Sequence, residues 1–179
     1  MGQDFPIFNQ PQEFPTVVPT SILIVNQDAL FSGTRLGQDI MVLEQKEQDD
    51  LVEVGRRIGA AFEQEEQSLT ELRDTLPADE FRLLADAFDE KVVNARSEQE
   101  ASDNTLIANI EARRRAFFQV IAPVLAGLMQ KYSATAIIDR RSVLLFDRNL
   151  DITSEAIELL DQVYSESPEM INLIGPENE

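Results

Sequence analysis

The chain has 179 residues, of which 43% are hydrophobic and 27% charged, a composition typical of a folded protein. Lys and Arg number 15 against 33 Asp and Glu, so the net charge is −18, which argues against a nucleic-acid ligand because phosphate binding needs a basic face. The sequence contains neither Cys nor His, which excludes disulfides, thiol nucleophiles, Ser-His triads and zinc sites with these ligands. The length allows one medium domain, or a small core with an extended appendage.

Residues 1–20 are rich in Pro and Phe and have no hydrophobic periodicity, so they are predicted to form an extended, partly disordered arm. Neither end of the chain resembles a signal peptide, because no basic stretch precedes an apolar run. At the other end, residues 165–179 are acidic and carry Pro168 and Gly175, which predicts a tail.

Three short runs at 22–26, 135–139 and 143–146 are apolar and mostly rich in β-branched residues, as in buried strands. Only Arg140, Arg141 and Ser142 separate the last two runs, so these are predicted to pair as a β-hairpin. A closing helix is predicted to follow, with Thr153 as its N-cap.

Two long stretches, 28–76 and 78–132, are predicted to be helical because few Gly or Pro residues interrupt them and their apolar residues follow steps of three and four. Pro77 suits the first turn of the second helix. The connection is short, so the helices should be antiparallel. At 1.5 Å per residue they would reach about 70 and 80 Å, which predicts a long hairpin on a small β region.

The apolar stripe is narrow and an isolated small sheet is marginally stable, so we predict an obligate homo-oligomer whose strands form a shared core. Residues expected in this oligomerisation core are Ile22, Ile24, Ile137, Val143, Leu145 and Phe146.

Gly55 and Gly59 lie inside the first helical stretch, where each weakens a helix by about 1 kcal/mol relative to Ala. They indicate either local weakness with close packing, or a hinge that lets the arms splay. Residues 113–115 are three consecutive Arg before an apolar run too short to span a bilayer. A solvated basic face beside a buried helix is expected there, in preference to a membrane or nucleic-acid patch.

Two end segments carry a family resemblance. Residues 22–31 (ILIVNQDALF) and 132–160, which include IIDRRSVLLFDRNLDITSE, resemble the first strand and the closing segment of the OmpH/Skp family of periplasmic chaperones. The resemblance implies an α+β, predominantly helical, jellyfish-like homotrimer. Residues 21–37 and 130–164 would form a β-rich trimerisation body with the closing helix. Residues 38–129 would form a coiled-coil hairpin tentacle with its tip near 74–80.

The resemblance also implies an ATP-independent holdase that keeps unfolded outer-membrane β-barrel proteins from aggregating in the periplasm, its signal peptide removed. Consistently, the sequence has no phosphate-binding GxxxxGK[ST] loop. We expect no enzyme activity, cofactor, metal or stable membrane insertion, and the net charge of −18 argues against binding to anionic lipid. An alternative is a structural or adaptor coiled coil that docks a folded envelope partner. Candidate client-binding residues, most of which could instead belong to the seam within the hairpin, are Phe62, Leu69, Leu76, Phe81, Leu83 and Phe88. Leu83 lies outside the predicted seam, so it is the candidate expected to be exposed.

Overall fold

The structure is a computed structural model, and it describes residues 21–174. In chain order the strands and α-helices are β1 (Ser21–Val25), α1 (Gln27–Gly33), α2 (Arg35–Leu72), α3 (Ala78–Lys131), β2 (Ala134–Asp139) and α4 (Thr153–Glu166), with short 3-10 helices at Arg140–Ser142, Arg148–Leu150 and Pro168–Leu173. The predicted α+β, predominantly helical fold is confirmed. The predictions for residues 1–20 and 175–179 lie outside the described residues.

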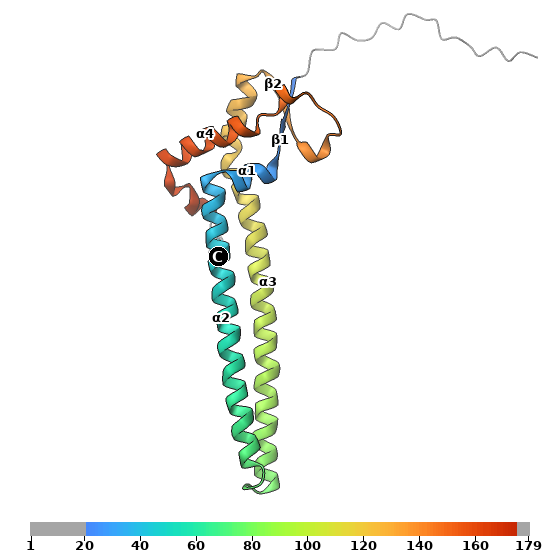
Figure 1. Cartoon of the computed structure of the whole chain (residues 1–179), viewed down its shortest axis with the longest axis vertical. Helices are drawn as coiled ribbons and strands as arrows, with labels where there is room; N and C mark the ends of the chain where they lie inside the picture. Colours follow the sequence, from blue (N-terminus) through green and yellow to red (C-terminus); the bar gives the residue numbers. More distant parts are fainter. Residues whose placement is uncertain (1–20, 175–179) are drawn as a thin grey trace, which may run out of the picture.

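The helices α2 and α3 form an antiparallel hairpin that projects from the rest of the molecule as a long arm (Figure 1). From their residue ranges, α2 is about 57 Å long and α3 about 81 Å, so the last turns of α3 continue into the body. Pro77 precedes α3, and Asp79 and Glu80 in its first turn face the positive end of the helix dipole. The predicted hairpin is therefore confirmed.

A sharp bend separates α1 from α2 and sends the arm away from the body. The hydroxyl of Thr34 accepts a hydrogen bond from the backbone N–H of Gly37 (3.2 Å), which caps α2. An ideal Cβ on Gly37 would lie 1.7 Å from the carbonyl oxygen of Phe31. Any residue larger than glycine would therefore force the backbone at this bend to shift.

The sheet of the body has two strands among the described residues, and it differs from the prediction. Strands β1 and β2 pair in parallel, with Ile22 opposite Ala136 and Val25 opposite Asp139. The predicted hairpin between 135–139 and 143–146 is wrong, since residues 143–146 are not a strand. The carboxylate of Asp139 accepts a hydrogen bond from the backbone N–H of Arg141 (2.8 Å) and starts a 3-10 turn, so the chain leaves the sheet at this point.

The hydrophobic core lies where the base of the arm meets α1 and α4, so the body of one chain is mostly helical where a β-rich body was expected. The rings of Phe31 and Phe117 meet edge to face, with their centroids 5.0 Å apart. Other fully buried members of this core are Leu30, Ile40, Ile121, Leu128, Ala156 and Leu160. This packing fixes the arm to the body.

Residues 165–174 are folded against the body, although the sequence predicts a tail there. The 3-10 helix Pro168–Leu173 contacts α2, α3 and α4. Ile174 is buried, and Met170 and Ile171 pack against the core. Three apolar residues at close spacing cover the end of the core, which explains why this acidic segment does not extend into solvent.

Thr153 is the first residue of α4 and not its N-cap. Its hydroxyl donates a hydrogen bond to the carboxylate of Asp151 (2.6 Å) and accepts one from the backbone N–H of Asn26 (2.9 Å). The same Asp151 carboxylate also accepts a hydrogen bond from the backbone N–H of Thr153 (3.0 Å). Thr153 thus joins the end of β1 to the start of α4.

Candidate functional site

The seam between α2 and α3 is made by half-buried side chains, and most candidate client-binding residues belong to it. Phe62, Leu69, Phe81 and Phe88 on the two helices are half-buried, and so is Leu76 in the turn between them. The rings of Phe62 and Phe88 meet edge to face at 5.8 Å. Leu83 differs from the others: it is 71% exposed and points away from the seam. Of the candidates, Leu83 offers a partner the most apolar surface; client binding by any of them stays a prediction.

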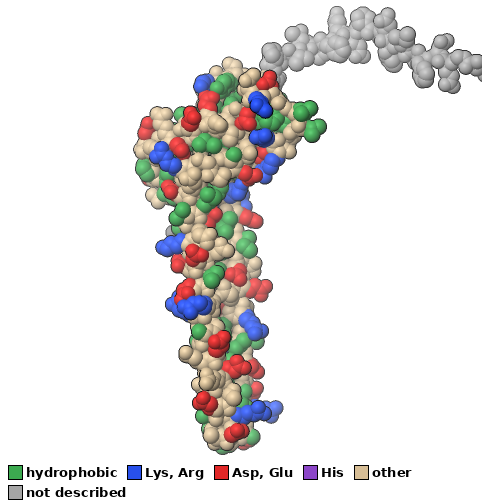
Figure 2. Space-filling view, viewed as in Figure 1, with side chains coloured by type: hydrophobic (Ala, Val, Ile, Leu, Met, Phe, Trp, Pro, Cys, Tyr) green, Lys and Arg blue, Asp and Glu red, His purple; other side chains and the backbone are tan. Residues whose placement is uncertain are grey.

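Other exposed apolar residues lie along the arm that the sequence analysis did not select. They are Val42, Val52, Val93 and Ile107, each more than half exposed. The sequence could have identified them, because each is an apolar residue that lies outside the stripe of apolar positions forming the seam. Figure 2 shows such side chains spread singly along the arm among charged ones. This face of the arm therefore presents many small apolar contacts and no single large patch.

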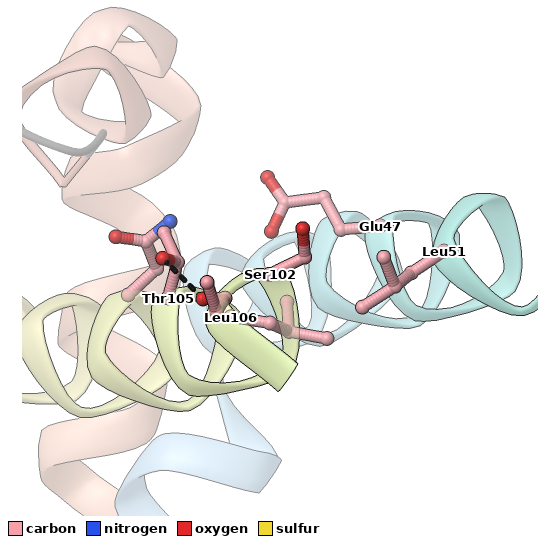
Figure 3. A pocket seen from close by; sticks show the side chains of 7 residues that line it. Glu47, Leu51, Ser102, Thr105 and Leu106 are labelled. Carbon is pink, nitrogen blue, oxygen red and sulfur yellow. Dashed lines mark hydrogen bonds between the residues drawn. The ribbon is translucent and has the colours of Figure 1, made fainter. Parts of the chain in front are cut away.

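Shallow hollows flank the seam, among them three that are lined by residues of both helices. One, of about 360 Å³, lies near the base of the arm and is lined by Glu47, Leu51, Ser102, Thr105 and Leu106 among others (Figure 3). A second, of about 300 Å³, shares Leu51 and Leu106 with it but opens on the other side of the seam.

The third hollow, of about 430 Å³, lies further toward the tip, beside Phe62 and Phe88. Gly59 lines this hollow, and Gly55 lines the second one. The helix α2 continues unbroken through both glycines, and the proposed hinge stays a prediction.

The three consecutive Arg residues form the expected solvated basic face only in part, because Arg114 and Arg115 are exposed and Arg113 is not. Arg113 is buried, 1% exposed, and donates two hydrogen bonds to the carboxylate of Glu47 at 2.8 and 2.5 Å. Arg114 forms an ion pair with Asp28, and its guanidinium lies 4.9 Å above the ring of Phe31. The Arg114 side chain is 46% exposed and that of Arg115 is 67% exposed. The register of α3 explains this, because Arg113 is four residues before the buried Phe117 and so faces the core.

The carboxylate of Glu44 lies beside this buried ion pair. Its Oε1 atom is buried and has no hydrogen-bond partner among the described residues, and the same is true of Arg113 Nε. Loss of hydration raises the pKa of Glu44 above its ordinary value of 4.5, although the charge of Arg113 opposes the shift. The base of the arm therefore contains a charge cluster whose hydrogen bonds are incompletely satisfied.

The predicted oligomerisation residues divide into three groups. Ile24 is 2% exposed, so it is covered within one chain and is unavailable to a second. Ile22, Ile137, Val143 and Phe146 are half-buried. Leu145 is 87% exposed, and its neighbour Leu144, which the sequence analysis did not select, is 95% exposed. The loop 143–146 thus leaves two large apolar side chains in solvent.

Within residues 21–174, no cluster of three or more Asp, Glu, His or Cys residues is suited to hold a metal ion. Among the helices described, none combines the length and the apolar character needed to cross a membrane.

The geometry is that of a helical-hairpin arm on a small α+β body. No family model matches the sequence, and no curated protein matches it. Among solved structures, the chain is similar to an OmpH-like protein from Caulobacter crescentus CB15, a candidate outer-membrane chaperone, with a TM-score of 0.75 over 88% of this chain and 92% of the other. The two sequences are 15% identical. The chain therefore has the OmpH-like fold that the residue patterns of its two end segments predict.

Proposed function

We propose that this protein is an ATP-independent holdase chaperone of the periplasm. It binds unfolded outer-membrane β-barrel proteins between its arms and prevents their aggregation. One observation carries the proposal: exposed apolar side chains, Leu83 and Val52 among them, are distributed along an arm that projects away from the core. The OmpH-like fold supports it, because the solved structure with that fold is itself a candidate outer-membrane chaperone.

Dispersed contacts suit a partner without fixed structure. An unfolded β-barrel protein exposes alternating apolar residues that aggregate edge to edge. Each apolar contact contributes about 25 cal/mol per Å² buried, so many small contacts reach the roughly 12 kcal/mol of a nanomolar complex. A net charge of −18 opposes binding to anionic lipid, which leaves polypeptide as the favoured ligand.

A cage requires several copies of the arm, and we propose a homotrimer. Leu144 and Leu145 support self-association, because two adjacent leucines almost fully exposed on the body are costly in solvent. The outer edge of β2 is unpaired among the described residues and also needs a partner, whereas the outer edge of β1 is bridged at Ile24 by Asp151. Segment 143–146 of one subunit would cover the outer edge of β2 in the next subunit, or the half-buried Ile137 of that subunit.

The test is suppression of aggregation. A urea-denatured outer-membrane barrel protein is diluted into buffer with increasing amounts of this protein, and light scattering is followed without ATP. Scattering should vanish near one trimer per client. Unchanged scattering, together with binding of a folded envelope protein only, would refute the holdase and favour the adaptor that the sequence left open.

A further inference from the structure

Gly55 and Gly59 lie one helical turn apart on the same side of α2, and both border hollows in the surface of the arm. The hollow that contains Gly55 and the one that contains Gly59 meet at Gln99 of α3, which lines both. The two hollows therefore form one shallow groove along one side of the hairpin, here called the glycine groove.

The missing side chains create this groove. A Cβ built on Gly59 would have no atom within 4 Å apart from its own helix neighbourhood, so the space beside it is open. A Cβ on Gly55 would meet only the side chain of Gln99, with Oε1 at 3.5 Å and Cδ at 3.9 Å. Apolar walls flank the open space, with the edges of Phe62 and Phe88 at one end and Val52 and Ile107 at the other.

The border of the groove is acidic. Glu66 and Asp89 lie at the end nearer the tip, and Asp103 lies at the end nearer the body. Arg96 is the one cationic residue among those that line the groove. Three carboxylates against one guanidinium give a negative rim around apolar walls. Such a surface favours apolar side chains flanked by Lys or Arg and disfavours those flanked by acids.

We infer that the glycine groove is a seat for extended polypeptide that carries an apolar side chain next to basic residues, inserted beside Gly59. This inference rests on the proposed holdase function and names one place on the arm where a client is held. It assigns the two glycines a role in binding in place of a hinge. A groove and a hinge make different predictions, since a groove is filled in proportion to side-chain size, whereas a hinge is stiffened by any residue other than glycine.

The experiment measures binding of a fluorescein-labelled peptide, Lys-Lys-Ser-Phe-Ser-Leu-Ser-Lys-Lys, to the full chain by fluorescence anisotropy. The variants are Gly59→Leu, which fills the groove, and Gly59→Ala, which adds one methyl group in open space. Ala60→Leu is the matched control, because Ala60 is exposed and does not line the groove. Circular dichroism checks the helices, which all three substitutions should leave intact or strengthen.

Gly59→Leu should raise the dissociation constant by about tenfold, which corresponds to about 1.4 kcal/mol, with Gly59→Ala and Ala60→Leu within about twofold of the parent. The matched peptide with Glu in place of Lys should bind more weakly to the parent chain. Equal losses for Gly59→Ala and Gly59→Leu would overturn the inference in favour of flexibility, and unchanged binding for all variants would overturn it outright. A parent chain that binds the peptide in this pattern but fails to suppress aggregation would refute the holdase and leave the groove standing.

Discussion

Arg113 on α3 donates two hydrogen bonds to the carboxylate of Glu47 on α2, a residue 66 positions earlier, where the two helices leave the body. The Arg113 side chain is almost fully buried, and that of Glu47 keeps 34% of its exposure. A buried charge without its partner is far more costly than the intact pair is favourable. The pair therefore fixes the relative register of the two helices at the base of the arm.

Arg113→Ala should lower the free energy of unfolding by about 3 kcal/mol, the lower end for a broken buried pair because Glu47 remains partly hydrated. Urea unfolding followed by circular dichroism measures this. Arg115→Ala is the control, since Arg115 lies only two residues further along the same helix and is solvated. Equal stability of the two variants would contradict the structural role of the pair.

Glu44→Gln should raise the free energy of unfolding at pH 7. Desolvation raises the pKa of Glu44 in the folded protein, so the folded state holds the proton more tightly than the unfolded chain does. The stabilisation that the protonated Glu44 provides is therefore lost as the pH rises from about 4.5 through the pKa in the folded state. The increase in the free energy of unfolding caused by Glu44→Gln should accordingly shrink as the pH falls toward 4.5. Unfolding midpoints at pH 5 and pH 7 test this.

Glu155→Gln is the matched substitution of opposite sign. Hydrogen bonds from Lys131 and Tyr132 lower the pKa of Glu155, so the unfolded chain binds the proton more tightly. This variant should be less stable than the parent above pH 4.5, and the difference should fade as the pH falls through the folded pKa. The same sign for both substitutions at pH 7 would show that the two environments are wrongly assigned.

Leu83→Ser should separate binding from stability on the arm. Because Leu83 is exposed, the free energy of unfolding of this variant should differ from that of the parent by less than about 0.5 kcal/mol. More of the variant than of the parent should be needed to suppress client aggregation. Phe62→Ala removes the edge-to-face contact with Phe88 and should cost about 2 kcal/mol, below the range for a fully buried Phe. If Leu83→Ser left suppression unchanged, this position would have no part in holding clients.

The double variant Leu144→Glu with Leu145→Glu should dissociate the oligomer. Two carboxylates in a buried apolar contact have no compensating partners, so association should weaken by more than a hundredfold, at least about 2.7 kcal/mol. Sedimentation velocity across a concentration series measures the change. Leu173→Glu provides the control, because Leu173 is also exposed on the body but lies outside the loop 143–146. A parent chain that is monomeric at micromolar concentration would contradict the proposed trimer.

Much of the helical architecture could be predicted because its signals are local. The stretch with few Gly and Pro residues, the stripe at steps of three and four, and Pro77 at the turn each act within one or two helical turns. The exposure of Leu83 followed from the same stripe, since a residue outside it cannot face the partner helix. The groove beside Gly59 could not be foreseen in this way, because its walls come from both helices.

The amino-acid order was thus sufficient for two long antiparallel helices, their turn and the apolar segments that enter the body, since neighbouring residues dictate these features. Contacts between distant segments settled the rest: β2 pairs in parallel with β1, residues 143–146 stay out of the sheet, Ile174 closes the core, and Arg113 is buried against Glu47. No local pattern distinguishes an arginine that meets a carboxylate across the seam from one that meets water. That distinction depends on which side chains packing brings within a few ångströms.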